Sequence, residues 1–370
     1  MSASRLAALP PSPIRRVSEG APAGAIPLGL GEPTWDLPEV ARRALAAETG
    51  PCAYGPNAGL PELREALARW HGAQVPEVRV TCGAQGALFA LMQGLLEPGD
   101  QVLVPDPGFP AYAALARLAG AEPVPYQLDP ESFRLSAAAF AEALAEAPRA
   151  RLAVFNHPSN PTGAGASRTE VEGVLGACAV RGVLAVGDEV YRELHFGERS
   201  VSLRDVDPTA LVVSSASKGW GGPGLRVGWM VGPEAVVQAA GGMHAWAVTA
   251  APAPCQRGAL ALVEASETVL PEARRELDLR WEALATAWAQ HLGTPLHRPD
   301  GAFYAWLPLP AAERDALAFC LRLRDEAGVV LVPGSAFGPA GEGHVRLSFG
   351  ARPEHITEGV RRLAPHWRTA

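Results

Sequence analysis

The chain has 370 residues, of which 48% are hydrophobic, and it contains no low-complexity tract. This length is enough to build a large core in two domains, or in one large and one small domain. Thirty-two Lys and Arg against 39 Asp and Glu give a net charge of −7, without any run of basic residues. Nucleic acid and anionic membranes are therefore poor candidate partners.

No apolar segment approaches the roughly 18 residues that a membrane span needs, and the N-terminal residues lack the apolar core of a signal peptide. We therefore expect a cytoplasmic protein. The five cysteines form no CxxC pairs and have no histidines at ligand spacing. This favours small buried side chains over a disulfide framework or a metal site.

Residues 1–30 are rich in Pro, Ala and Gly, which predicts an N-terminal arm with little regular structure of its own. Helical periodicity begins near Leu37, and residues 60–70 are expected to form an amphipathic helix with leucines on one face. The arm is therefore expected to lead directly into helical structure.

Apolar runs of strand length then alternate with helical segments. The runs cover residues 102–104, 152–155, 183–186, 211–213 and 227–231, and the helices include 87–96 and 169–180. Strands that are apolar throughout and separated by helices predict an α/β fold, with a mainly parallel sheet covered on both faces.

The C-terminal part predicts a smaller α+β domain. Residues 272–291 and 314–327 have helical patterns, and the segment HVRLSF at 344–349 reads as a strand. We predict a small domain from residues 31–44 and 266–370, and a large domain from residues 45–265.

Polar residues follow several of the apolar runs. In an open parallel sheet, ligands bind outside the carboxyl ends of the strands, so these residues are expected to converge at one edge. They are Asp106, Phe109, Asn156, Asn160, Asp188, Tyr191 and residues 215–218.

The chain contains 31 arginines and one lysine, Lys218. Because arginine stands in place of lysine everywhere else in the chain, the one lysine that remains points to a task that arginine cannot perform. Arginine stays protonated, whereas a desolvated lysine can form an imine with a carbonyl. A surface lysine left by chance is the alternative, and the surroundings of Lys218 decide between the two.

Two candidate anion sites lie close to this lysine in the predicted arrangement. The segment SSASKGWGGPGLRVGW places Ser215, Ser217 and Arg226 around the amine. In TCGAQGALFAL, a Gly-rich turn opens a helix, and free N–H groups near Ala84 and Gln85 would point at a phosphate.

The motifs taken together resemble the class I aminotransferases, which are fold-type-I enzymes that depend on pyridoxal 5'-phosphate (PLP). The resemblance runs nearly end to end, through eight segments in family order. They are GEP at 31–33, YGPNAGLPELREAL at 54–67, CGAQGAL at 82–88, DPGFPAY at 106–112, NHPSNPTG at 156–163, DEVYREL at 188–194, SASKGWGGPGLRVGW at 215–229 and PGSAFGPAGEGHVRLSFG at 333–350.

The resemblance implies that Lys218 carries the cofactor as a Schiff base and acts as general acid and base. Asp188 would keep the pyridine nitrogen protonated, while Tyr191 and Asn160 would bind the phenolic oxygen of the cofactor. Phe109 would stack on the ring, although a plain core phenylalanine is the rival interpretation.

Further roles implied by the resemblance concern the phosphate and the substrate. Ala84, Gln85, Ser215, Ser217 and Arg226 would hold the phosphate. Tyr54 would reach the phosphate of a partner subunit, which implies a homodimer with shared active sites. Arg346 would clamp the substrate α-carboxylate, with Gly31 and Asn160 beside it.

The predicted activity is a two-step transamination between an L-amino acid and a 2-oxo acid. A PLP-dependent C–S β-lyase or another elimination enzyme on the same scaffold is the alternative, although such lyases typically carry a His where this chain has Tyr191. A regulator that borrowed the fold is a further rival, opposed by the complete set of catalytic residues. No residue for the distal side chain of the substrate is evident. Trp35, Trp220 and Trp246 could line its pocket or pack elsewhere.

Overall fold

The computed structural model describes Leu6, Leu9 and residues 13–50 and 53–368. Its centre is a seven-stranded sheet in the order β2-β8-β7-β6-β5-β3-β4. Strand β8 pairs antiparallel with both of its neighbours, and the other pairs are parallel. The strands are β2 (Val78–Thr81), β3 (Gln101–Asp106), β4 (Glu122–Gln127), β5 (Ala150–Asn156), β6 (Leu184–Asp188), β7 (Leu211–Ser215) and β8 (Gly228–Val231). The predicted mainly parallel α/β fold is confirmed.

Helices cover both faces of this sheet, as the apolar strands require. Alternate residues of one strand enter different cores. Val102 and Val104 pack into one cluster, whereas Leu103 packs into the other. One face carries α5 (Gly83–Leu95), α6 (Ala111–Leu118) and α10 (Glu234–Val248). The other carries α4 (Pro61–His71), α7 (Ala137–Ala145), α8 (Arg168–Arg181), α9 (Leu203–Val206) and α11 (Ala253–Glu264), with α3 (Glu39–Ala46) packed on α11.

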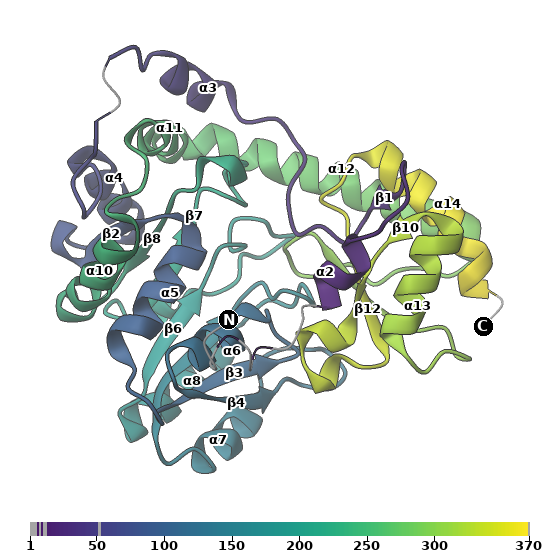
Figure 1. Ribbon diagram of the computed structural model, residues 1–370, viewed down its shortest axis with the longest axis horizontal. Coiled ribbons are helices and arrows are strands. Elements are labelled where there is room, and N and C mark those ends of the chain that lie inside the picture. Colours follow the sequence, from purple (N-terminus) through teal and green to yellow (C-terminus); the bar gives the residue numbers. More distant parts are fainter. Residues whose placement is uncertain (1–5, 7–8, 10–12, 51–52, 369–370) are drawn as a thin grey trace.

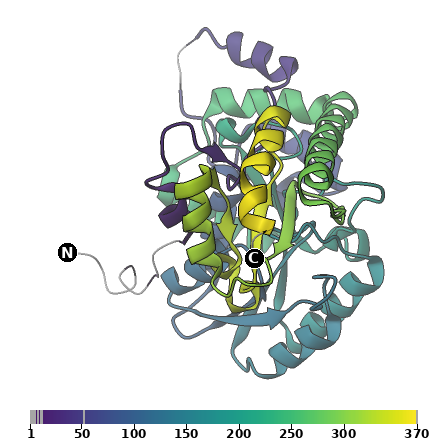
Figure 2. The same ribbon diagram turned by 90° about the vertical axis from the view of Figure 1, so that its right-hand side faces the viewer.

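The C-terminal part is built around a three-stranded antiparallel sheet in the order β11-β12-β9. The long helix α12 (Ser266–Leu292) runs along the top of Figure 1 from the large sheet to this part, where it packs against α14 (Pro353–Arg368). Figure 2 shows α13 and α14 in front of the small sheet. The other elements are β9 (Tyr304–Pro308), α13 (Ala316–Arg322), a π-helical turn (Leu323–Ala327), β11 (Val332–Pro333) and β12 (His344–Ser348).

The N-terminal segment has more regular structure than the sequence suggests. Residues 13–18 form the short helix α2 (Pro13–Ser18), and β1 (Ile26–Pro27) pairs in parallel with β10 (Val329–Val330). Val17 and Leu28 are buried in the core of the C-terminal part. The described part of the predicted arm is thus packed onto that part. The domain boundaries themselves stay a prediction.

Two strands of the large sheet were not among the predicted apolar runs. Strand β4 contains Pro123 and Pro125, and three of its six residues are exposed, since it pairs on one side only. Strand β2 is buried but only four residues long.

No helix in the described part of the chain is both long and apolar enough to cross a lipid bilayer.

Helix α5 approaches the sheet closely because β8 begins with a glycine. A Cβ atom on Gly228 would lie 2.4 Å from the backbone nitrogen of Ala84, in the first turn of α5. The absence of a side chain at Gly228 therefore fixes how near the start of α5 lies to β7 and β8.

We expect Gly228→Ala to lower the free energy of unfolding by about 1–3 kcal/mol, because the new methyl group must displace the start of α5. Thermal and denaturant unfolding measure the change. Gly176→Ala in α8 is the control, since a Cβ there meets nothing within 4 Å and should stabilise the helix by up to about 1 kcal/mol. Equal effects of the two substitutions would contradict the close approach.

Candidate active site

A cavity of about 590 Å³ lies at the carboxyl edge of the large sheet, against the small sheet. Strands β5, β6 and β7 end at Asn156, Asp188 and Ser215, and all three residues line it. The expected convergence at this edge is therefore present. Of the predicted site residues, all but Tyr54 line the cavity: Gly31, Ala84, Gln85, Phe109, Asn160, Asp188, Tyr191, Ser215, Ser217, Lys218, Arg226 and Arg346.

Some side chains that the sequence placed near this edge lie elsewhere. Asp106 ends β3 but accepts a hydrogen bond from the Ala340 backbone and does not line the cavity. Trp35 and Trp220 line a different hollow, of about 780 Å³, beside α12. Trp246 is 90% exposed on α10. The suggestion that these three tryptophans line the substrate pocket is wrong for the cavity of this chain.

The start of α5 provides backbone donors at one end of the cavity. The first N–H groups of a helix have no acceptors within it, and Ala84 and Gln85 lie in this first turn. Gly83 has φ +72°, and a Cβ there would lie 2.7 Å from a guanidinium nitrogen of Arg226. The turn therefore brings free N–H groups beside Arg226, an arrangement suited to an anion.

Asp188 is buried and firmly oriented. Its carboxylate accepts a hydrogen bond from the Tyr112 hydroxyl at 2.6 Å, and its backbone carbonyl accepts one from the Asn156 amide at 2.7 Å. Burial raises the pKa of Asp188 to about 6, against the lowering effect of the Tyr112 hydrogen bond. A buried carboxylate in this position favours a cation beside it.

Lys218 reaches the same cavity from the loop after β7 and donates a hydrogen bond to the Gly31 carbonyl. Burial lowers its pKa to about 8, while the nearby charge of Glu32 opposes the shift. A share of this amine is therefore neutral near pH 8, and only the neutral form acts as nucleophile or proton acceptor.

Arg346 is 3% exposed, on the central strand of the small sheet. It donates to the Asn160 side-chain oxygen and to the Gly29 carbonyl, both at 2.7 Å, and its Nε has no partner. Among the described residues no carboxylate forms an ion pair with Arg346. A buried guanidinium without an anion is costly, so this one is suited to receive a carboxylate.

Three lining residues were given no specific contact in the sequence analysis, although Asn156 was expected at this edge. Tyr112 and Asn156 orient Asp188, and both lie in segments whose motifs signal the site without signalling these contacts. The hydroxyl of Tyr304 lies 2.6 Å from that of Tyr191, and its ring lies 4.4 Å from the Arg346 guanidinium carbon. Tyr304 lies on β9, in a segment with no motif, so no sequence signal could have found it.

Comparisons of the sequence and of the fold with known proteins agree with this geometry. A sequence model described as aminotransferase class I and II matches residues 23–363. The aspartate/prephenate aminotransferase of Thermus thermophilus is 35% identical over 365 residues, which cover 92% of this chain and 90% of that protein.

Solved structures give the same picture. The aspartate aminotransferase from Thermus thermophilus with maleate has a TM-score of 0.90 at 32% identity, covering 99% of each chain. The aromatic aminotransferase from Pyrococcus horikoshii has a TM-score of 0.85 at 30% identity, covering 94% of this chain and 97% of that one. The chain belongs to the class I and II aminotransferases. It is an aminotransferase of fold type I, and the elimination alternative is not favoured.

The raised pKa of Asp188 predicts how the cofactor-free chain responds to pH. Because the pKa in the folded state lies above the usual 3.8, folded wild type loses stability as the pH rises from about 4 to above 6. Asp188→Asn removes the ionisation, so at pH 8 the cofactor-free variant should be more stable by on the order of 2 kcal/mol.

Melting temperatures of the two cofactor-free proteins between pH 4 and pH 8 measure this difference. The same substitution at the exposed Asp278, on α12, is the control. A wild-type protein that stays the more stable of the two at pH 8 would show that the Asp188 charge is already compensated without a cofactor.

Proposed function

We propose that the cavity binds PLP and one amino acid or 2-oxo acid at a time, and that Lys218 is the point of covalent attachment of the cofactor. The charged groups around one cavity support this function. A lysine with a lowered pKa, a buried carboxylate with a raised pKa and a buried arginine without an anion all line it.

The residues present fit this cofactor. The first turn of α5, Ser215, Ser217 and Arg226 suit its phosphate, and Asp188 suits its ring nitrogen. Phe109 lies edge-on to Tyr112 at 5.5 Å between ring centroids, and it lines the cavity where it can contact a ring. When bound, PLP supplies an aldehyde carbon and a conjugated ring that delocalises the electron pair left on the substrate Cα.

Different residues of the chain then transfer the proton, hold the reacting groups in place and bind the substrate. Lys218 Nζ accepts the Cα proton and returns it, a role typically worth about 10²–10⁴-fold in rate. Tyr191 presents a hydroxyl held by Tyr304, and Asp188 is held by Tyr112, so neither group must reorient during the reaction. Arg346 binds the α-carboxylate and thereby sets the position of Cα.

We further propose a homodimer in which Tyr54 acts in the active site of the partner. Tyr54 is 89% exposed and does not line the cavity of its own chain. The next residue, Gly55, lies against Ala253 at the start of α11, five residues after α10 ends. Trp246, near the end of α10, is also exposed, and two large exposed aromatic side chains near the connection between α10 and α11 support an interface there.

The single lysine provides the sharpest test of the proposed attachment. Borohydride reduction of the holoenzyme should fix one pyridoxyl group per chain, and peptide mapping should place it on Lys218. Lys218→Arg keeps the charge but has no amine that can attach or accept a proton, so it should nearly abolish transamination while retaining the fold. The α-amino terminus is the only other primary amine, and label found there would refute the attachment.

Arg346→Lys keeps the positive charge but loses the planar fork, so we expect KM for active amino acids to rise about 30-fold or more. The absorption spectrum of the bound cofactor should stay unchanged. Steady-state kinetics with a panel of amino acids and 2-oxoglutarate measure the effect, and Arg149→Lys, at an exposed position, serves as control. An unchanged KM throughout the panel would mean that another group binds the carboxylate.

A further inference from the structure

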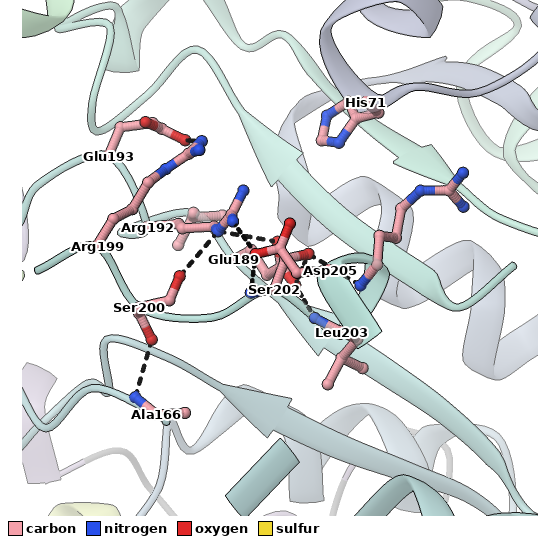
Figure 3. A network of polar contacts seen from close by, with 12 residues as sticks. His71, Ala166, Glu189, Arg192, Glu193, Arg199, Ser200, Ser202, Leu203 and Asp205 are labelled. Carbon is pink, nitrogen blue, oxygen red and sulfur yellow. Dashed lines mark hydrogen bonds and ion pairs between the residues drawn. The ribbon is translucent and has the colours of Figure 1, made fainter. Parts of the chain in front are cut away.

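A small polar hollow of about 220 Å³ lies beside the segment that follows Tyr191 and shares no lining residue with the catalytic cavity. It lies between the C-terminal end of α4, residues 192–199 and α9. Figure 3 shows the polar network around it. Its lining residues are Trp70, His71, Arg192, Arg199, Ser202, Arg204 and Asp205.

Two of its three arginines already have carboxylate partners. Arg192 pairs with Asp205, and more distantly with Glu189 at 4.0 Å. Arg199 pairs with Glu193 and lies 5.8 Å from the centre of the Trp70 ring. The charges of these two arginines are thus compensated within the chain.

Arg204 has no such partner. It is 9% exposed, its Nη1 donates to the Ala210 carbonyl at 3.0 Å, and its buried Nε has no acceptor. No carboxylate of the described residues forms an ion pair with it. This combination is the same as at Arg346, where it indicates a carboxylate site. Arg79 also lacks a carboxylate, but it is enclosed between β2 and α10 and lines neither this hollow nor the catalytic cavity.

Three arginines and one carboxylate, that of Asp205, line the hollow, and the carboxylates of Glu189 and Glu193 pair with Arg192 and Arg199 from outside it. His71 accepts a hydrogen bond from Trp229 at 2.9 Å. Burial lowers the pKa of His71 to about 3, and the charges of the three arginines add to the shift, so this ring is neutral. Asp205 also lines the hollow, but Arg192 and the Ser202 backbone already bind its carboxylate.

The hollow is connected to the catalytic loop through Glu189, the residue after Asp188. Glu189 accepts hydrogen bonds from the Ser202 hydroxyl at 2.7 Å and from the Leu203 backbone at 3.0 Å. The Ser202 hydroxyl in turn accepts one from the Arg204 backbone at 3.1 Å. A ligand bound by Arg204 would therefore restrict the motion of the turn that contains Asp188 and Tyr191.

We propose that this hollow is a second anion site, which binds one phosphate-sized oxyanion with Arg204 as its main cation. Arg192 and Arg199 line its sides, and Trp70 forms an apolar wall. The oxyanion is free phosphate or the phosphate group of a small monoester. Guanidinium groups suit both sources, because they bind tetrahedral oxyanions with paired N–H donors.

Isothermal titration calorimetry of the holoenzyme with inorganic phosphate tests the proposal, at constant ionic strength set with chloride. On the proposed function, the cofactor phosphate would occupy the site at α5 in the holoenzyme, and the measurement does not depend on transamination. Wild type should bind one phosphate per chain, and Arg204→Gln should weaken this binding about 30-fold or more. Phenyl phosphate is titrated in parallel, and tighter binding of it would identify a monoester as the ligand.

Two controls separate this site from the others. Arg346→Lys should keep the phosphate binding, because it alters only the substrate site, and so should Arg149→Gln. If Arg204→Gln does not fold, Arg199→Gln replaces it, with an expected weakening of about fivefold. The proposal is overturned if wild type shows no saturable phosphate binding, if Arg204→Gln, or Arg199→Gln in its place, leaves the binding unchanged, or if Arg346→Lys removes it.

Discussion

The active site depends on one carboxylate held where its own charge is unfavourable. Asp188 is buried at the end of β6, and the Tyr112 hydroxyl and the Asn156 amide fix its position. Burial shields the carboxylate from most of the solvent, so it is stabilised best by a cation placed directly against it. The parallel strands make this possible, because their carboxyl ends bring Asn156 and Asp188 to the same register in adjacent strands.

Arg346 presents the complementary case on the opposite side of the cavity. It comes from the small sheet, and only neutral oxygens of Asn160 and Gly29 accept its hydrogen bonds. Asn160 follows β5 of the large sheet, so this contact joins the two sheets across the cavity. The Asp188 carboxylate and the Arg346 guanidinium both line the cavity. A charged cofactor and a zwitterionic substrate bound there can supply the opposite charge that each of them lacks.

Much of this arrangement can be predicted from sequence, for definite physical reasons. Strands β5, β6 and β7 are apolar runs, as β3 and β8 are, and parallel strands of this kind bring the residues after them to one edge. Strand β4 could not be predicted in this way, since its prolines and exposed positions are typical of loops as well as of edge strands. The presence of Tyr304 in the site and the direction in which the Trp220 side chain points depend on how distant segments of the chain pack against each other. The indole of Trp220 turns to Ser266 on α12, which no local pattern indicates.

Tyr304 also limits how this site can change. Its hydroxyl lies 2.6 Å from that of Tyr191 and would lie 2.8 Å from a Cβ atom at position 31. Any side chain at Gly31 would therefore push Tyr304 away from both Tyr191 and the Arg346 guanidinium. Redesign of substrate scope is consequently better directed to Ile14 and Leu30, which line the same cavity from α2 and the segment after β1.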